Sequence, residues 1–123
     1  MPAVDTVELG QQSENTDAVI LSNIIGNLYP NDAEILLEQT KRILKRGGKI
    51  LIKLNQYLNR EQIEKYNIKS IGDELLDDGL LLWNRTDNEW SNLIEKYFKI
   101  KHHGDIYYPE HQQTNRIFLA EKL

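Results

Sequence analysis

The segments Ala18-Val-Ile-Leu-Ser22 and Lys49-Ile-Leu-Ile-Lys-Leu54 decide the fold of this 123-residue chain. Short, continuous apolar runs that contain β-branched residues are typical of strands buried on both faces of a parallel sheet. The segment between them is long enough for a helical crossover, which is right-handed in nearly all known sheets. Residues 17–54 are therefore predicted to form a βαβ unit.

The connecting segment has the signals of a helix that begins near Pro30. Asn31 or Asp32 is positioned to accept the first free backbone N–H groups. An apolar stripe at three- and four-residue spacing is expected to face the sheet, and its members are Ala33, Leu36, Leu37, Thr40, Ile43 and Leu44. We expect the helix to end at Gly47-Gly48, where one glycine takes the left-handed cap conformation.

Candidate ligand-binding residues follow the carboxyl ends of both strands. Asn23, Ile24 and Gly26 come after the first strand, and Asn55 and Tyr57 come after the second. In open α/β sheets, ligands bind beyond these ends. We expect Asn23 to hydrogen-bond a ligand and Gly26 to allow close backbone approach. The alternative is that Asn23 and Asn55 only satisfy loose backbone groups at the strand ends.

The order of these motifs resembles the second half of a class I S-adenosylmethionine-dependent methyltransferase. The resembling residues are Thr16-Asp-Ala-Val-Ile-Leu-Ser-Asn23 and Arg42-Ile-Leu-Lys-Arg-Gly-Gly-Lys-Ile-Leu-Ile-Lys53, with Arg46 where the family usually has proline. The resemblance implies an α/β fold, a truncated Rossmann-like methyltransferase sheet with flanking helices and a C-terminal antiparallel hairpin. In the family's order, the strands present would lie together as the fourth, fifth, seventh and sixth.

The resemblance also implies a cofactor, S-adenosylmethionine, and a small-molecule substrate. It places Asn23, Ile24 and Gly26 on the cofactor side, and Asn55, Tyr57 and Trp83 on the substrate side. The family holds its cofactor mainly in a glycine-rich loop, and no G-x-G-x-G pattern occurs in the sequence. We therefore expect this chain alone to be inactive and to bind the cofactor weakly or not at all. The residues do not identify a catalytic group.

The chain is predicted to be a single partial methyltransferase-like domain, 1–123. Residues 1–16 form a short strand or a tail, and 55–85 form an insertion on the substrate side. Within that insertion, Asn59 caps a short helix that buries Ile63 and Tyr66, and 68–78 is a solvated loop. Residues 86–123 form a helix and a hairpin. Thr86 and Glu89 make a capping box for that helix, which buries Trp90, Leu93, Ile94 and Tyr97.

Composition excludes several classes of function. The net charge of −4 gives no electrostatic attraction to nucleic acid or to an anionic membrane, and no apolar run is long enough to span a bilayer. The absence of cysteine fits a cytoplasmic protein. No metal site is expected, because the adjacent His102 and His103 point to opposite faces of a strand.

Two readings of the function follow. The first is a methyltransferase-like protein of small-molecule type, and the alternative is a non-catalytic dimerisation or interaction module derived from one. In either case, the apolar strand 18–22 would lie at a sheet edge, which invites pairing with another chain. We expect a homodimer or a partner polypeptide that supplies the missing half. The sequence does not identify the methyl acceptor.

Overall fold

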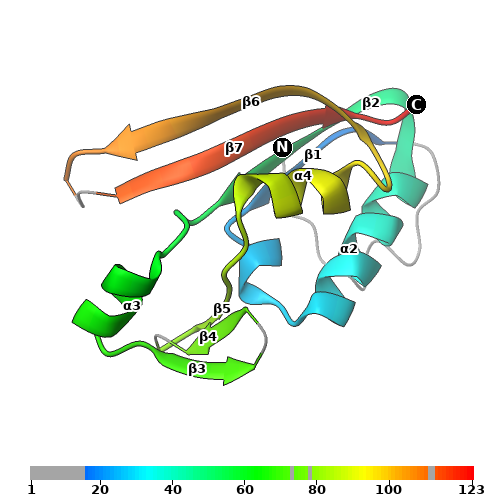
Figure 1. Cartoon of the computed structure of the whole chain (residues 1–123). Helices are drawn as coiled ribbons and strands as arrows, with labels where there is room; N and C mark the ends of the chain where they lie inside the picture. The colour runs from blue at the N-terminus through cyan, green and yellow to red at the C-terminus, as the bar shows by residue number, and fades with distance from the viewer. Residues whose placement is uncertain (1–15, 73, 78, 111–112) are drawn as a thin grey trace.

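The computed structural model describes residues 16–72, 74–77, 79–110 and 113–123. Its main feature is a four-stranded sheet that is covered on one face by two helices (Figure 1). The expected strand or tail at 1–16 lies outside the described residues, except for Thr16. Among the helices that are described, none combines the length and the apolar composition that a bilayer span requires.

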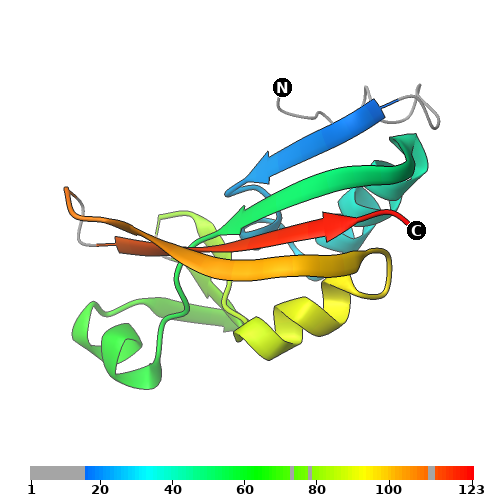
Figure 2. The same cartoon turned by 90° about the horizontal axis from the view of Figure 1, so that it is seen from above.

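The sheet has the predicted strand order, and Figure 2 shows its four strands side by side. β1 (Thr16–Ser22) pairs in parallel with β2 (Leu44–Leu54), which confirms the βαβ unit. β2 pairs antiparallel with β7 (Gln113–Glu121), and β7 pairs antiparallel with β6 (Lys99–Tyr108). The C-terminal hairpin and the order β1-β2-β7-β6 are therefore confirmed.

Helix α2 (Pro30–Ile43) forms the crossover between β1 and β2. Its buried residues belong to the predicted stripe, and they are Ala33, Leu36, Leu37, Thr40 and Ile43. The predicted side-chain cap was wrong: the N-cap residue is Tyr29, which makes no side-chain cap hydrogen bond. Pro30 occupies the first turn, where its missing N–H costs nothing.

The predicted helix end at Gly47-Gly48 was also wrong, because α2 ends at Ile43 and the backbone of Leu44 is already extended. Gly47 does have a positive φ of 78°, but it lies in β2. Its N–H donates to Lys122 O at 2.8 Å, and Gly48 O accepts from Lys122 N–H at 2.9 Å. The glycines thus join the start of β2 to the end of the chain.

Helix α4 (Asp87–Ile94) begins with the predicted capping box between Thr86 and Glu89, which is confirmed. It buries Trp90, Leu93 and Ile94 against the same face of the sheet that α2 covers (Figure 1). Tyr97, which follows the helix, is only partly buried. Trp90 contacts Trp83 edge to face, with ring centroids 5.1 Å apart. These residues belong to the main hydrophobic core.

The insertion 55–85 contains more structure than the sequence predicted. Three short strands, β3 (Lys69–Gly72), β4 (Leu75–Asp77) and β5 (Leu81–Trp83), form a second antiparallel sheet. Two of them, β3 and β4, lie where a loop was expected over 68–78. The prediction failed because every residue of β3 is exposed, so the strand has no apolar alternation to reveal it.

Helix α3 (Arg60–Lys65) has the expected Asn59 cap, in a capping box with Gln62. The expected burial of Ile63 and Tyr66 was wrong. No residue of α3 is buried, and Tyr66 is 62% exposed. The helix lies apart from the main sheet, beside the small one (Figure 1), so its apolar residues do not reach the main core.

A polar cluster connects α2 to the segment after α4. Glu34 Oε1 lies 2.6 Å from Lys96 Nζ and accepts from the Tyr97 hydroxyl at 2.9 Å. The hydrogen bonds from Lys96 and Tyr97 lower the pKa of Glu34. Burial, together with the bond to Glu34, raises the pKa of Tyr97 to about 12.

We expect this cluster to make the free energy of unfolding depend on pH in the acid range. A carboxyl whose folded-state pKa is lowered stabilises the fold above its ordinary pKa, here 4.5, and loses that effect as the pH falls through the folded-state value. Because the pair is partly exposed, Lys96→Met should reduce the acid-dependent loss by only about 0.5 kcal/mol. Urea denaturation at a series of pH values measures this change as a free energy of unfolding. Lys69→Met, an exposed lysine on β3, is the control and should leave the acid dependence unchanged.

Candidate functional site

Asn23 and Asn55 lie at the same edge of the main sheet, as the parallel arrangement of β1 and β2 requires. The Asn23 N–H donates to Lys53 O at 2.9 Å, and Asn23 has a left-handed backbone with φ of 55°. The chain then turns into the short 3-10 helix η1 (Ile25–Asn27). Asn23 Oδ1 is buried and has no hydrogen-bond partner among the residues that the structure describes. It is therefore an acceptor that needs a donor.

The other two residues predicted for the cofactor side are packed inward. Ile24 is partly buried against the main core. Gly26 is buried, and a Cβ added to it would lie 3.4 Å from Leu54 Cδ2, so its open side faces the core. Of the three residues, Asn23 alone has a buried polar atom that fits a ligand donor. Of the residues predicted for the cofactor side, Asn23 is thus the one that offers a polar contact to a cofactor.

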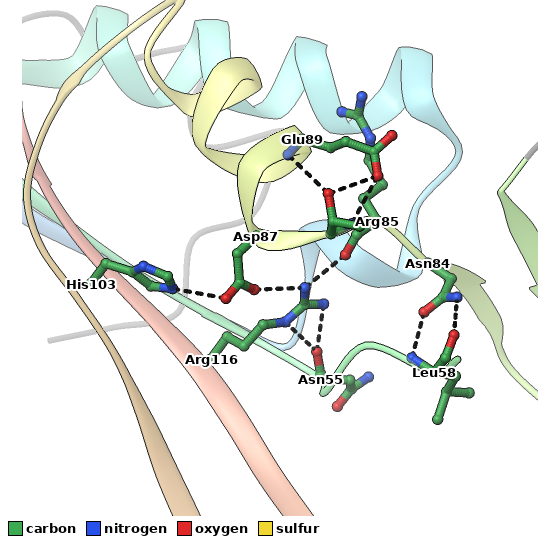
Figure 3. Close-up of polar contacts among 9 residues, drawn as sticks. Asn55, Leu58, Asn84, Arg85, Asp87, Glu89, His103 and Arg116 are labelled. Atoms are coloured by element: carbon green, nitrogen blue, oxygen red, sulfur yellow. Dashed lines mark hydrogen bonds and ion pairs between the residues drawn. The ribbon is translucent and has the colours of Figure 1, made fainter. Parts of the chain in front are cut away.

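Arg116 holds the strand end at Asn55 in place (Figure 3). Its Nε and Nη2 donate to Asn55 O at 3.0 and 2.7 Å. Its Nη1 donates to Arg85 O at 2.7 Å and to Asp87 Oδ1 at 3.1 Å. The Arg116 side chain is only 7% exposed, so these bonds are shielded from water. This arginine therefore connects β7, the end of β2 and the start of α4.

Two further contacts support the same region (Figure 3). Asn84 Oδ1 accepts from Leu58 N–H at 2.9 Å, and Asn84 Nδ2 donates to Leu58 O at 2.8 Å, so the loop after β2 is paired with the residue after β5. His103 Nε2 lies 3.3 Å from Asp87 Oδ2, and its ring stacks on Phe118 at 4.4 Å between centroids. No group of three metal-ligating side chains occurs in the described part of the chain.

A cavity of about 720 Å³ lies beside these strand ends. Its lining comes from the loop after β1, the loop after β2, α3, the small sheet and the start of β7, and consists of Asn27, Asn55, Gln56, Leu58, Gln62, Tyr66, Ile68, Leu80, Leu82, Gln113 and Asn115. Six of these residues carry carboxamides. Asn115 is only 8% exposed.

The structure separates the three residues that were predicted for the substrate side. Asn55 lines the 720 Å³ cavity. Trp83 belongs to the main core and borders a smaller cavity of about 320 Å³ between Glu34 and Arg85. Tyr57 is 43% exposed on the loop after β2.

Sequence reasoning missed most of the carboxamides that line the larger cavity. Asn27 had a local signal, because it ends the Asn23–Asn27 stretch after the first predicted strand. No such local signal exists for the carboxamides that are far from that stretch in sequence, which are Gln62, Gln113 and Asn115.

The strand order and the hairpin are those expected of a class I methyltransferase sheet, and solved structures agree. The chain superposes on a SAM-dependent methyltransferase from Methanosarcina mazei with a TM-score of 0.77 and 13% identity, covering 99% of this chain and 66% of that one. It is also similar to the 1,6-didemethyltoxoflavin-N1-methyltransferase of Burkholderia thailandensis, solved with S-adenosylhomocysteine (TM-score 0.67, 15% identity, 89% of this chain and 45% of that one). The chain therefore has a methyltransferase-like fold.

The fold by itself does not establish methyl transfer. Another similar structure is the [4+2]-cyclase SpnF, with a TM-score of 0.67 and 14% identity over 98% of this chain and 56% of that one. Across these three structures, the chain spans from 45% to 66% of their length. No family model matches the sequence, and no curated protein matches it.

Proposed function

We propose that the chain forms the acceptor side of a SAM-dependent methyl-transfer site for a small molecule. The observation that carries the proposal is Asn23 Oδ1, which is buried without a described partner at the carboxyl end of β1 in a methyltransferase-like sheet. Leaving such an acceptor unsatisfied costs about 1–3 kcal/mol, so a donor is expected to complete it. The α-ammonium group of S-adenosylmethionine is a donor of the right kind.

The role proposed for these residues is to position the cofactor and the methyl acceptor. When bound, the cofactor supplies an electrophilic methyl group on a sulfonium. Asn23 would hold its amino-acid end, and the cavity beyond β2 would orient the acceptor for in-line approach. Arg116 keeps the Asn55 turn in place through two hydrogen bonds to its carbonyl. Many nucleophiles need no strong base for this transfer, which fits a site built from carboxamides.

The remaining cofactor contacts would come from a second copy of the chain or from a completing polypeptide. No glycine-rich G-x-G-x-G loop occurs in the sequence. In the described sheet, β1 is an edge strand and pairs only with β2. An apolar edge of this kind favours addition of another strand. We propose a cytoplasmic protein in which this edge is covered by a homodimer partner or by a completing polypeptide.

Titration with S-adenosylhomocysteine tests the proposal. The 123-residue chain should show no saturable heat of binding below about 1 mM, because one polar contact gives little affinity. If the adjoining coding sequence carries a strand followed by G-x-G-x-G, the protein with both parts should bind in the micromolar range. In that protein, Asn23→Ala should weaken binding about tenfold, or about 1.4 kcal/mol. The control is Asn31→Ala on the exposed side of α2.

Two outcomes would contradict the proposal. Micromolar binding by the 123-residue chain alone would show that no further residues are needed. If the completed protein failed to bind S-adenosylhomocysteine, the proposed cofactor would be excluded. The alternative, a non-catalytic interaction module, would then be favoured. The edge strand β1 is the feature that supports this alternative. Light scattering after size exclusion would then have to show a dimer or a complex, and a monodisperse monomer at high concentration would contradict it.

A further inference from the structure

The cavity beyond β2 is unusual in its side-chain chemistry. Six carboxamide side chains line it, and they are Asn27, Asn55, Gln56, Gln62, Gln113 and Asn115. Among the described residues of the lining, none carries a charge. The six come from segments far apart in the chain. A ligand in this cavity would therefore meet neutral hydrogen-bond donors and acceptors and no counter-charge from these residues.

Hydrogen bonds to the backbone fix the orientation of three of these carboxamides. Asn27 Nδ2 donates to Leu81 O at 2.8 Å, which leaves the Asn27 oxygen as the available acceptor. Gln56 Oε1 accepts from Thr114 N–H at 3.2 Å, which leaves the Gln56 amino group as a donor. Gln62 Oε1 accepts from Asn59 N–H at 2.9 Å, with the same result. The lining thus offers oriented groups of both kinds.

The side chains of Asn55 and Asn115 line the cavity without a hydrogen bond to another described residue, and neither is among the buried unpaired groups, so their amide atoms are open to the solvent in the cavity. Asn115 is the more informative because it is 8% exposed on β7. Water in the cavity can pair with these amide atoms, so a ligand that displaces this water has to replace its hydrogen bonds. A bound molecule with matching donors and acceptors could therefore pair with Asn55 and Asn115 in place of this water.

From this arrangement we infer that the cavity binds an uncharged, planar molecule with an amide or lactam edge. Such an edge carries one acceptor and one donor side by side, which is the complement of a carboxamide. Leu58, Leu80 and Leu82 give apolar surface for the faces of a ring. Burying a charge here would be unfavourable, because the described lining has no opposite charge to pair with it. A volume of about 720 Å³ suits a small molecule.

This inference rests on the proposed function, because it names the chemical class of the methyl acceptor. Its test, however, needs no cofactor. The probe is quinolin-2-one, a neutral bicyclic lactam, and the comparison is 2-naphthoate, a bicyclic anion of similar size. Each is titrated into the ¹⁵N-labelled chain, and the side-chain NH₂ resonances of asparagine and glutamine are followed. Quinolin-2-one should shift the resonances of Asn55, Gln56 and Asn115, and 2-naphthoate should not.

Variants link the effect to the cavity. Asn115→Leu keeps the size of the side chain and removes its polar atoms, and it should weaken quinolin-2-one binding about tenfold. Asn55→Ala removes the other carboxamide that has no described partner, and it should also weaken quinolin-2-one binding. This variant serves as the test if Asn115→Leu fails to fold. The Arg116 bonds go to the backbone oxygen of Asn55, so this variant preserves them. Asn31→Leu, on the exposed side of α2, is the control and should bind normally.

The outcomes separate this inference from the proposed function. Equal binding of the anion, or loss of binding in the Asn31 control as well, would overturn the inference and leave the S-adenosylhomocysteine titration untouched. Selective lactam binding that depends on Asn115 or Asn55 would support it. That result would stand even if the completed protein failed to bind S-adenosylhomocysteine, and the cavity would then be a binding site without methyl transfer.

Discussion

Replacing Arg116 by alanine is expected to lower the free energy of unfolding by about 3–5 kcal/mol, the range found when one partner of a buried ion pair is removed. The guanidinium makes four hydrogen bonds, two to Asn55 O, one to Arg85 O and one to Asp87 Oδ1. Its side chain is 7% exposed, so water cannot replace these bonds without entering the fold. Asp87 is 45% exposed and regains solvent, which places the effect toward the lower end of the range.

Urea denaturation of the purified variant measures this loss. The matched control is Arg60→Ala, which removes an arginine that is 94% exposed and pairs with Glu64 within α3. Such a surface pair contributes about 0.3–0.5 kcal/mol. In the Arg116→Ala variant, the side-chain NH₂ resonance of Asn55 should also move or broaden, because the turn after β2 loses its anchor. A loss of stability no larger than that of the control would show that the network is not structural.

Replacing Trp90 by alanine is expected to cost a similar amount, about 3–5 kcal/mol. Trp90 is fully buried in α4 and is among the largest buried side chains of the core. Its ring packs edge to face on Trp83, with an interplanar angle of 66°. Truncation removes this contact and leaves a cavity between α4 and the sheet that the surrounding β-strands cannot fill.

The control for Trp90 is phenylalanine. Trp90 Nε1 is buried and has no hydrogen-bond partner among the described residues, so Trp90→Phe removes a polar atom that gains nothing from its position. We expect Trp90→Phe to cost about 1 kcal/mol, mainly from the smaller ring. Comparison of the two midpoints in urea checks this. If both variants lost the same stability, the indole N–H rather than packing would be the important feature.

The local elements of the main domain could be predicted from short-range patterns. The two apolar runs identified β1 and β2, and the spacing of Ala33, Leu36, Leu37 and Thr40 identified the buried stripe of α2. The capping boxes of α3 and α4 depend on residues three apart. The errors fall where local signals are weak: an exposed strand, β3, has no alternation, and the glycines that suggested a helix end lie inside β2 instead.

The sequence by itself determined the βαβ unit, the hairpin and the polar residues at the strand ends, because each depends on a periodicity or a spacing within a few residues. Tertiary structure alone decided which of those residues share a site. Arg116 contacts Asn55 across 61 positions and Arg85 across 31, and the carboxamides of the cavity come from both ends of the described chain. Such groupings depend on the path of the backbone, which no local pattern encodes, and they determine which polar atoms are paired inside the protein and which face a ligand.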